Sequence, residues 1–248
     1  MFSMPANQIQ EICSFAHTAD KEARSDLVRG FIVNENDYTS NFTGALRRII
    51  NSNSTTGLSA TSHLLQPPDE RLMGCDATII ITCNGYYKVA TFEAKYPRIS
   101  QSHYSWDYAQ TSSDISHFSD QLDRQKRFAS QHAIFEMFYC EIDFGKQPSH
   151  MQAYVSSCVW HEDAVAFDSS RSSPQQVWGS TDLENMLKRG NEPIEKVLES
   201  VCECSKGEPK PRFGSIPEIA KEFSLWGEVL HIAGAEQQPE DSEYGKWS

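Results

Sequence analysis

The feature that most constrains the fold of this chain is a β-hairpin predicted around the dipeptide Asn84-Gly85. An apolar segment at residues 72–81 precedes the dipeptide, and a second one at residues 86–94 follows it. Asn-Gly between two strand-like segments favours a two-residue type I′ turn, because both residues adopt positive φ angles readily. Such a turn sets the register of the two strands, and with it the face on which each side chain lies.

The predicted register brings two acidic side chains together. Counting outward from the turn pairs Cys83 with Tyr86 and, further along, Asp76 with Glu93. Because side chains alternate between the faces of a strand, Glu93 and Lys95 point the same way. Facing carboxylates destabilise a sheet unless a cation such as Mg²⁺ or Mn²⁺ lies between them. The hairpin is therefore a candidate metal site, although Asp followed by Glu-x-Lys also occurs by chance, and a β-bulge would shift the register.

An Asp on one strand and Glu-x-Lys on the next resembles the PD-(D/E)xK nuclease superfamily, which has the restriction-endonuclease-like fold. Asp76 takes the first position, without the family's frequent proline, and Glu93-Ala94-Lys95 takes the second. The resemblance covers residues 31–160 and implies an α/β fold with a central mixed β-sheet flanked by helices. It also implies phosphodiester hydrolysis, with Mg²⁺ or Mn²⁺ held by Asp76, Glu93 and the Ala94 carbonyl, and with Lys95 assisting the attacking water.

Two further positions resemble motifs of the same family. Glu35 is similar to an acidic metal ligand at the start of a helix, although an acid there also complements the helix dipole, and Asp37 could cap the helix. Gln121 is similar to a glutamine that positions water or substrate near the metal. Gln121 and Gln125 lie one helical turn apart, and a solvated helix face would show the same polar stripe.

Candidate substrate-binding residues lie close to these motifs. A loop after Lys95 carries aromatic side chains on which nucleobases could stack, although packing against the body of the protein explains them equally well. Basic side chains nearby could contact phosphates. The candidates are Arg98, Tyr104, Trp106, Arg124 and Gln125.

The charge balance argues against nonspecific coating of nucleic acid. The chain has 22 Lys and Arg against 34 Asp and Glu, a net charge of −12, whereas affinity for phosphates comes largely from basic residues. Two alternatives to a DNA nuclease therefore stay open. One is a catalytically inactive module of the same fold that binds protein or nucleic acid, and the other is a hydrolase of RNA or nucleotides. A homodimer is expected only by analogy with nucleases that cut both strands.

We expect four parts: an N-terminal helix at 1–30, the core at 31–165 that the family resemblance implies, a peripheral C-terminal helical region at 166–232 and an acidic disordered tail at 233–248. Residues 57–70 show no clear period. We expect helices at 4–30, 37–50, 114–131, 182–189, 193–204 and 217–232, strands at 72–81, 86–94, 133–142 and 152–160, and a surface loop at 161–163.

Cysteine usage and hydropathy predict the cellular compartment of the protein. Seven cysteines, an odd number, are scattered through apolar segments, which favours free thiols in a reducing environment. Cys202 and Cys204 have no second pair at zinc-finger spacing, and two half-buried thiols on a helix are expected there. No stretch approaches the ~20 apolar residues of a membrane span, and the first residues lack an apolar signal segment. We therefore expect a cytoplasmic protein without membrane contact.

Overall fold

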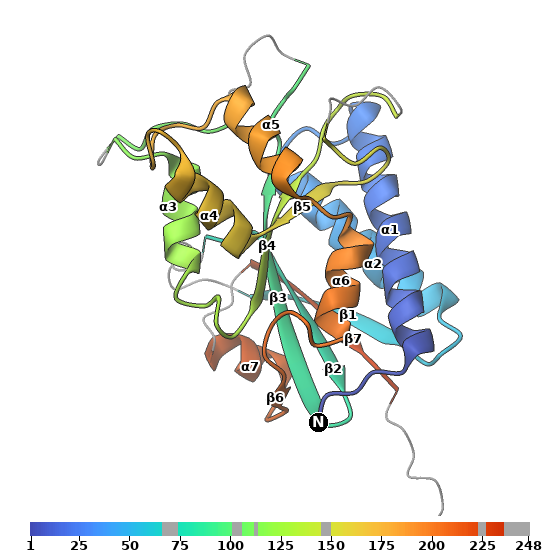
Figure 1. Cartoon of the computed structure of the whole chain (residues 1–248). Helices are drawn as coiled ribbons and strands as arrows, with labels where there is room; N and C mark the ends of the chain where they lie inside the picture. The colour runs from blue at the N-terminus through green and yellow to red at the C-terminus, as the bar shows by residue number, and fades with distance from the viewer. Residues whose placement is uncertain (66–73, 101–105, 112–113, 145–149, 223–226, 236–248) are drawn as a thin grey trace, which may run out of the picture.

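The protein has one open mixed β-sheet with helices on both faces (Figure 1), which confirms the predicted α/β class. The sheet has seven strands within the part of the chain that the computed structural model describes. That part comprises residues 1–65, 74–100, 106–111, 114–144, 150–222 and 227–235.

Helices and strands are mixed along the chain. Their bounds are α1 (Ala6–Val28), α2 (Glu35–Asn53), β1 (Ser59–Leu65), β2 (Ala77–Cys83), β3 (Tyr86–Lys95), α3 (His117–Gln125), β4 (Ala133–Phe138), β5 (Ser157–Trp160), α4 (His161–Ser170), α5 (Ser180–Arg189), α6 (Ile194–Cys202), β6 (Lys210–Pro211), α7 (Ile216–Glu222) and β7 (Gly227–Ala233).

The strands lie in the order β1-β7-β2-β3-β4-β5, and the short β6 pairs with the start of β3. The hairpin β2–β3 is antiparallel, whereas β4 runs parallel to β3. A parallel neighbour needs a crossover connection, and α3 lies in the one between β3 and β4. The hairpin therefore occupies the centre of the sheet, and the crossover helix lies beside it.

Two helical layers cover the sheet. Helices α1, α2 and α6 lie on one face, and α3, α4 and α7 lie on the other (Figure 1). The largest apolar core forms between the first group and the sheet, because α1 presents a stripe at three- and four-residue spacing. That stripe consists of Ile12, Ala16, Ala19, Ala23 and Leu27, all buried.

The prediction of a helix at 217–232 is wrong for its second half. Helix α7 ends at Glu222, and residues 227–233 form β7, which lies between β1 and β2. Val229, Leu230 and Ile232 are fully buried there because strands flank β7 on both sides and helices lie above and below. The C-terminal region is therefore neither wholly helical nor wholly peripheral. Strand β1, in the segment without a clear period, was not predicted.

Other boundaries also differ from the predictions. The predicted loop at 161–163 is the first turn of α4, with His161 buried. Helix α3 is shorter than the predicted 114–131, and Ser116 caps it by accepting a hydrogen bond from the Ser119 amide. Strands β4 and β5 are also shorter than predicted. Helix α2 begins two residues earlier than predicted, and its cap is Asn34 rather than Asp37.

The remaining predictions concern the cysteines, the membrane and the tail. All seven cysteines are free, with Cys202 buried at the end of α6 and Cys204 exposed. None of the described helices combines the length and apolar character that a membrane crossing requires. Residues 236–248, which make up most of the predicted tail, lie outside the described part of the chain.

Candidate functional site

The hairpin turn has the predicted geometry. Asn84 and Gly85 have φ angles of 49° and 73°, as a type I′ turn requires. Cys83 pairs with Tyr86, and the register runs unbroken to the pair Ala77 and Phe92. The next residues outward are Asp76 and Glu93, so the predicted juxtaposition of the two acids is present.

A pocket of about 700 Å³ opens between this end of the hairpin and α3. Its wall combines the segment before β2, the polar face of β3, the stretch before α3 and one side of α3. The lining residues are Gly74, Cys75, Asp76, Glu93, Tyr108, Gln110, Thr111, His117, Asp120, Gln121 and Arg124. We call this the hairpin pocket.

Hydrogen bonds hold both acids in place. The Asp76 carboxylate accepts a hydrogen bond from the Ala94 amide at 2.8 Å. Glu93 is only 4% exposed, and its Oε1 accepts from Lys95 Nζ at 2.6 Å and from the Gln121 side-chain amide. Glu93, Lys95 and Gln121, which were all predicted for catalysis, are thus joined by hydrogen bonds, whereas Asp76 is held separately by the Ala94 amide.

Glu35 reaches the same region from the first turn of α2. Its Oε1 accepts a hydrogen bond from the Tyr96 amide at 2.9 Å, just beyond the end of β3. Its charge raises the pKa of Asp76 and also that of Lys95. The structure therefore brings Glu35 to the acidic end of the hairpin, although it does not line the hairpin pocket.

More acidic than basic groups are buried in this region: Glu93 and Glu136 are buried with Lys95, and Asp76 lies beside them. Burial raises the pKa of Asp76 to about 6, with Glu35 and Glu136 adding to the rise while Lys95 and the Ala94 amide oppose it. Burial and then the Asp76 charge raise the pKa of Glu93 well above its usual range. Burial alone would lower the pKa of Lys95, but the surrounding carboxylates outweigh it and raise that pKa. Lys95 is therefore a protonated cation among acids.

Glu136 is a buried acid that the sequence reasoning missed. Strand β4 places it beside Glu93 in parallel register. Glu136 is fully buried, and neither of its carboxylate oxygens has a hydrogen-bond partner among the described residues. His161 Nδ1 lies 3.8 Å from Oε1. A single glutamate within the apolar strand segment AIFEMF was the signal available, because such a residue is costly to bury without a role.

Gln125 is buried between elements rather than aimed at the pocket. Its Nε2 donates to the Gly74 carbonyl at 2.8 Å, and its Oε1 lies 2.9 Å from His161 Nδ1. It therefore ties α3 to α4 and to the segment that carries Asp76. This position favours a structural role over the substrate contact that was predicted for it.

The predicted substrate-binding residues are scattered. Trp106 is only 9% exposed, and its ring packs against Phe118, Phe138 and Trp178. Trp106 therefore offers no face to a nucleobase, which corrects that prediction. Arg124 does line the hairpin pocket, where it pairs with Asp120 at 3.0 Å.

The other two substrate-binding candidates and two further residues complete this account. Arg98 is exposed and lies over the Tyr96 ring at 5.5 Å, away from the pocket lining. Tyr104 lies outside the described residues. Tyr108, one of the aromatic residues of the loop after Lys95 on which nucleobases could stack, lines the pocket, and so does His117, which was not proposed as a site residue. The signal for His117 was its position on the polar stripe of the helix that carries Gln121.

The donor chemistry of the pocket suits a hard divalent cation. Within the described ranges, no three His, Cys, Asp or Glu side chains converge as a complete metal cage. Mg²⁺ commonly uses only one or two carboxylates and takes its other ligands from water, carbonyls and substrate phosphate. Asp76 and Glu93 meet that requirement, and their mutual repulsion is what a cation would relieve.

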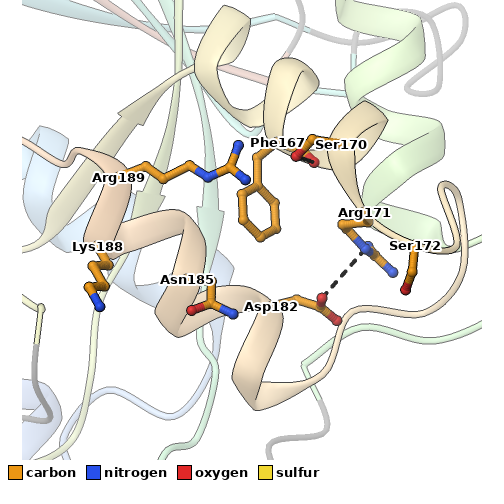
Figure 2. Close-up of a pocket in the computed structure, with 8 residues that line it drawn as sticks. All are labelled: Phe167, Ser170, Arg171, Ser172, Asp182, Asn185, Lys188 and Arg189. Carbon is orange, nitrogen blue, oxygen red and sulfur yellow. Dashed lines mark hydrogen bonds and ion pairs between the residues drawn. The ribbon is translucent and has the colours of Figure 1, made fainter.

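A second pocket, of about 520 Å³, lies between α4 and α5 (Figure 2). Arg171 there pairs with Asp182 at 3.6 Å and with Asp168 at 3.2 Å. The Arg189 guanidinium lies over the Phe167 ring at 4.7 Å. Asp182 lines this pocket and is paired with Arg171, and no other acid lines it among the described residues. The α4–α5 pocket therefore lacks the two-carboxylate arrangement of the hairpin pocket.

No protein-family model, no curated protein and no solved structure matches this chain. The resemblance to PD-(D/E)xK nucleases therefore depends on Asp76, Glu93 and Lys95 and on the residues around them. What the hairpin pocket can do has to be inferred from its own side chains.

Proposed function

We propose that this chain is a metal-dependent phosphodiesterase, a nuclease of the PD-(D/E)xK kind, with DNA as its substrate. One observation carries the proposal: Asp76 and Glu93 come from neighbouring segments of the hairpin and line one pocket, and the buried Lys95 is hydrogen-bonded to Glu93 at 2.6 Å. Burying neighbouring acids costs folding free energy, so a stable fold alone does not account for them. A cation-binding, phosphate-cleaving site does account for them.

Asp76 and Glu93 would hold Mg²⁺ or Mn²⁺, with the Ala94 carbonyl, water and substrate phosphate as further ligands. Glu35 would act on this site through its charge rather than as a third carboxylate ligand. When bound, the ion would polarise the phosphoryl group and lower the pKa of a water molecule. The chain itself supplies the remaining interactions. Gln121 donates to Glu93 and thereby orients its carboxylate, and Ala94 does the same for Asp76 through its amide.

Lys95 acts as a cation in this proposal rather than as a base. The carboxylates around it raise its pKa, so its ammonium group keeps its proton at neutral pH. A fixed positive charge close to the reacting group stabilises the negative charge that develops on a phosphate in the transition state. The removal of this charge should therefore lower the rate of cleavage more than it weakens substrate binding.

The test is a cleavage assay of the full chain with Mg²⁺ or Mn²⁺ on labelled single-stranded DNA, duplex DNA and RNA. We expect Glu93→Gln and Lys95→Met each to lower the rate at least about 100-fold, as the loss of one electrostatic group at a reacting centre does. Asp123→Asn and Lys126→Ala, which change an exposed ion pair on α3, are the matched controls and should cleave normally.

Mn²⁺ titration separates this proposal from an inactive binding module of the same fold. A nuclease site requires Mn²⁺ affinity that Glu93→Gln lowers and Asp123→Asn does not. Equal cleavage by all variants, or no carboxylate-dependent Mn²⁺ affinity, would overturn the proposal. Cleavage of RNA with no cleavage of DNA would keep the chemistry and replace the substrate.

A further inference from the structure

One aromatic side chain in the hairpin pocket is unusually exposed. Tyr108 is 58% exposed, and its ring stacks on the ring of His117 with centroids 4.7 Å apart and planes 14° apart. Both residues line the same pocket as Asp76 and Glu93. One face of the Tyr108 ring therefore rests on His117, while much of the side chain remains open to solvent beside the acids.

The backbone under this ring pair is well anchored. The His117 amide donates to the Tyr108 carbonyl at 2.8 Å, and Ala109 and Ser116 form a β-bridge. The neighbouring Asp107 is buried and accepts from the Ser116 hydroxyl at 2.7 Å and the Trp178 amide at 2.8 Å. The exposed ring is thus held on a rigid support, which lowers the entropy cost of binding a flat ligand.

The chemistry around the ring suits a nucleotide. Burial, Lys95 and Arg124 lower the pKa of His117, so its imidazole is neutral at neutral pH and stacks as an uncharged ring. Gln110 and Thr111 line the same wall and offer hydrogen-bonding groups to a base edge. A volume of about 700 Å³ lies within the range of small-molecule sites.

We propose that the open face of Tyr108 is a stacking platform for an unpaired nucleobase of the substrate whose phosphodiester is cleaved at Asp76 and Glu93. This inference rests on the proposed nuclease function and narrows its substrate class. A base inside a duplex is already stacked on both faces and cannot occupy the platform without being extruded. The site should therefore favour single-stranded or locally unpaired DNA.

The test measures binding of a labelled single-stranded oligonucleotide and of the same sequence as a blunt duplex, in EDTA so that no cleavage occurs. We expect Tyr108→Ala to weaken single-strand binding about 5- to 100-fold, the range seen when one base loses its aromatic partner. Tyr108→Phe should bind as the wild type does, because the ring is retained. The matched control is Tyr154→Ala, which removes another exposed tyrosine, 49% exposed and outside the pocket.

A second readout reports stacking directly. An oligonucleotide with 2-aminopurine loses fluorescence when that base stacks, so quenching on binding should occur with the wild type and Tyr108→Phe and not with Tyr108→Ala. Melting temperatures of the variants should agree, because the exposed ring contributes little to stability.

The stacking platform would be overturned if Tyr108→Ala bound single strands as the wild type does, or if the wild type did not bind single strands. It would also be overturned if Tyr154→Ala weakened single-strand binding equally, or if Tyr108→Ala weakened duplex binding as much as single-strand binding. Failure of the nuclease proposal looks different, because binding in EDTA does not depend on catalysis. Normal cleavage by Glu93→Gln with selective loss of single-strand binding by Tyr108→Ala would reject the nuclease site and keep the stacking surface.

Discussion

The two faces of strand β3 differ sharply although their residues alternate along one segment. Ala90, Phe92 and Ala94 point into the apolar core, where Phe92 stacks on Phe135 at 5.3 Å. Glu93 and Lys95 point the other way and are buried almost as deeply, but with charges. Burial of the first face stabilises the protein, whereas burial of the second face costs stability unless the charges are paired.

The two faces of β3 should therefore contribute differently to stability and to chemistry. Residues on the apolar face should affect the free energy of unfolding and leave the chemistry of the folded protein intact. Residues on the charged face should affect chemistry strongly, and their neutralisation should cost little stability or even increase it. Three measurements test this difference between buried apolar and buried charged groups.

The largest effect is expected from Phe92→Ala on the apolar face. The ring is fully buried and contacts Phe42 and Phe135, so its loss leaves a cavity. We expect the free energy of unfolding to fall by about 3–5 kcal/mol in urea titrations, while the folded fraction keeps its Mn²⁺ affinity. Phe31→Ala, which removes a ring that is 74% exposed, is the control and should cost much less. Loss of Mn²⁺ affinity in folded Phe92→Ala would contradict the claim that the apolar face affects stability alone.

An intermediate effect is expected from the ionisation of Asp76. Its pKa of about 6 in the folded protein lies above its ordinary value of 3.8, so the folded state holds the proton more tightly than the unfolded state does. Stability should therefore fall as pH rises from about 4 to 6, by at most about 3 kcal/mol. Because the side chain is partly exposed, the measured loss should be smaller than this limit.

Asp76→Asn isolates this contribution because asparagine does not titrate. In EDTA, the stability of the wild type relative to Asp76→Asn should decline between pH 4 and 6 and then level off. Mg²⁺ added above pH 6 should stabilise the wild type and leave Asp76→Asn unchanged. A relative stability that is independent of pH, or that rises with pH, would contradict the assignment of Asp76 to a buried acidic cluster.

The smallest effect is expected from Glu136→Gln. Glu136 has no hydrogen-bond donor for its carboxylate among the described residues, and its charge raises the pKa of Asp76 and Glu93. Neutralisation should increase the free energy of unfolding at pH 8 by about 1 kcal/mol, and it should lower the pH at which Asp76 ionises. Glu184→Gln on α5 is a control outside the hairpin pocket. A clear loss of stability in Glu136→Gln would show that Glu136 contributes to the fold.

The hairpin could be predicted from the sequence because local chemistry determines its geometry. Asn84-Gly85 selects a two-residue turn, and the turn sets a register that carries through to Asp76 and Glu93. The helices at the N-terminus were equally accessible, since their apolar stripes repeat at helical spacing over 23 and 19 residues. In both cases neighbours along the chain determine the structure.

Long-range neighbours explain what the sequence reasoning missed. Residues 227–233 have apolar side chains that fit either a helix or a strand, and their position between β1 and β2 decides for the strand. Trp106 was ambiguous between a binding loop and the core until Phe118 and Trp178 enclosed it. Glu136 joins the acidic cluster only because a parallel crossover places β4 beside β3.

The amino-acid sequence by itself determined the hairpin, its turn and the pairing of two acids beside a lysine, because all three follow from contacts within about twenty residues of chain. Tertiary structure alone decided that these acids face a pocket under α3, that Glu136 adds a further charge, and that Tyr108 rather than Trp106 offers an open ring. The physical reason is burial: which charges lose solvent and which rings keep it depends on the layers that fold over the sheet.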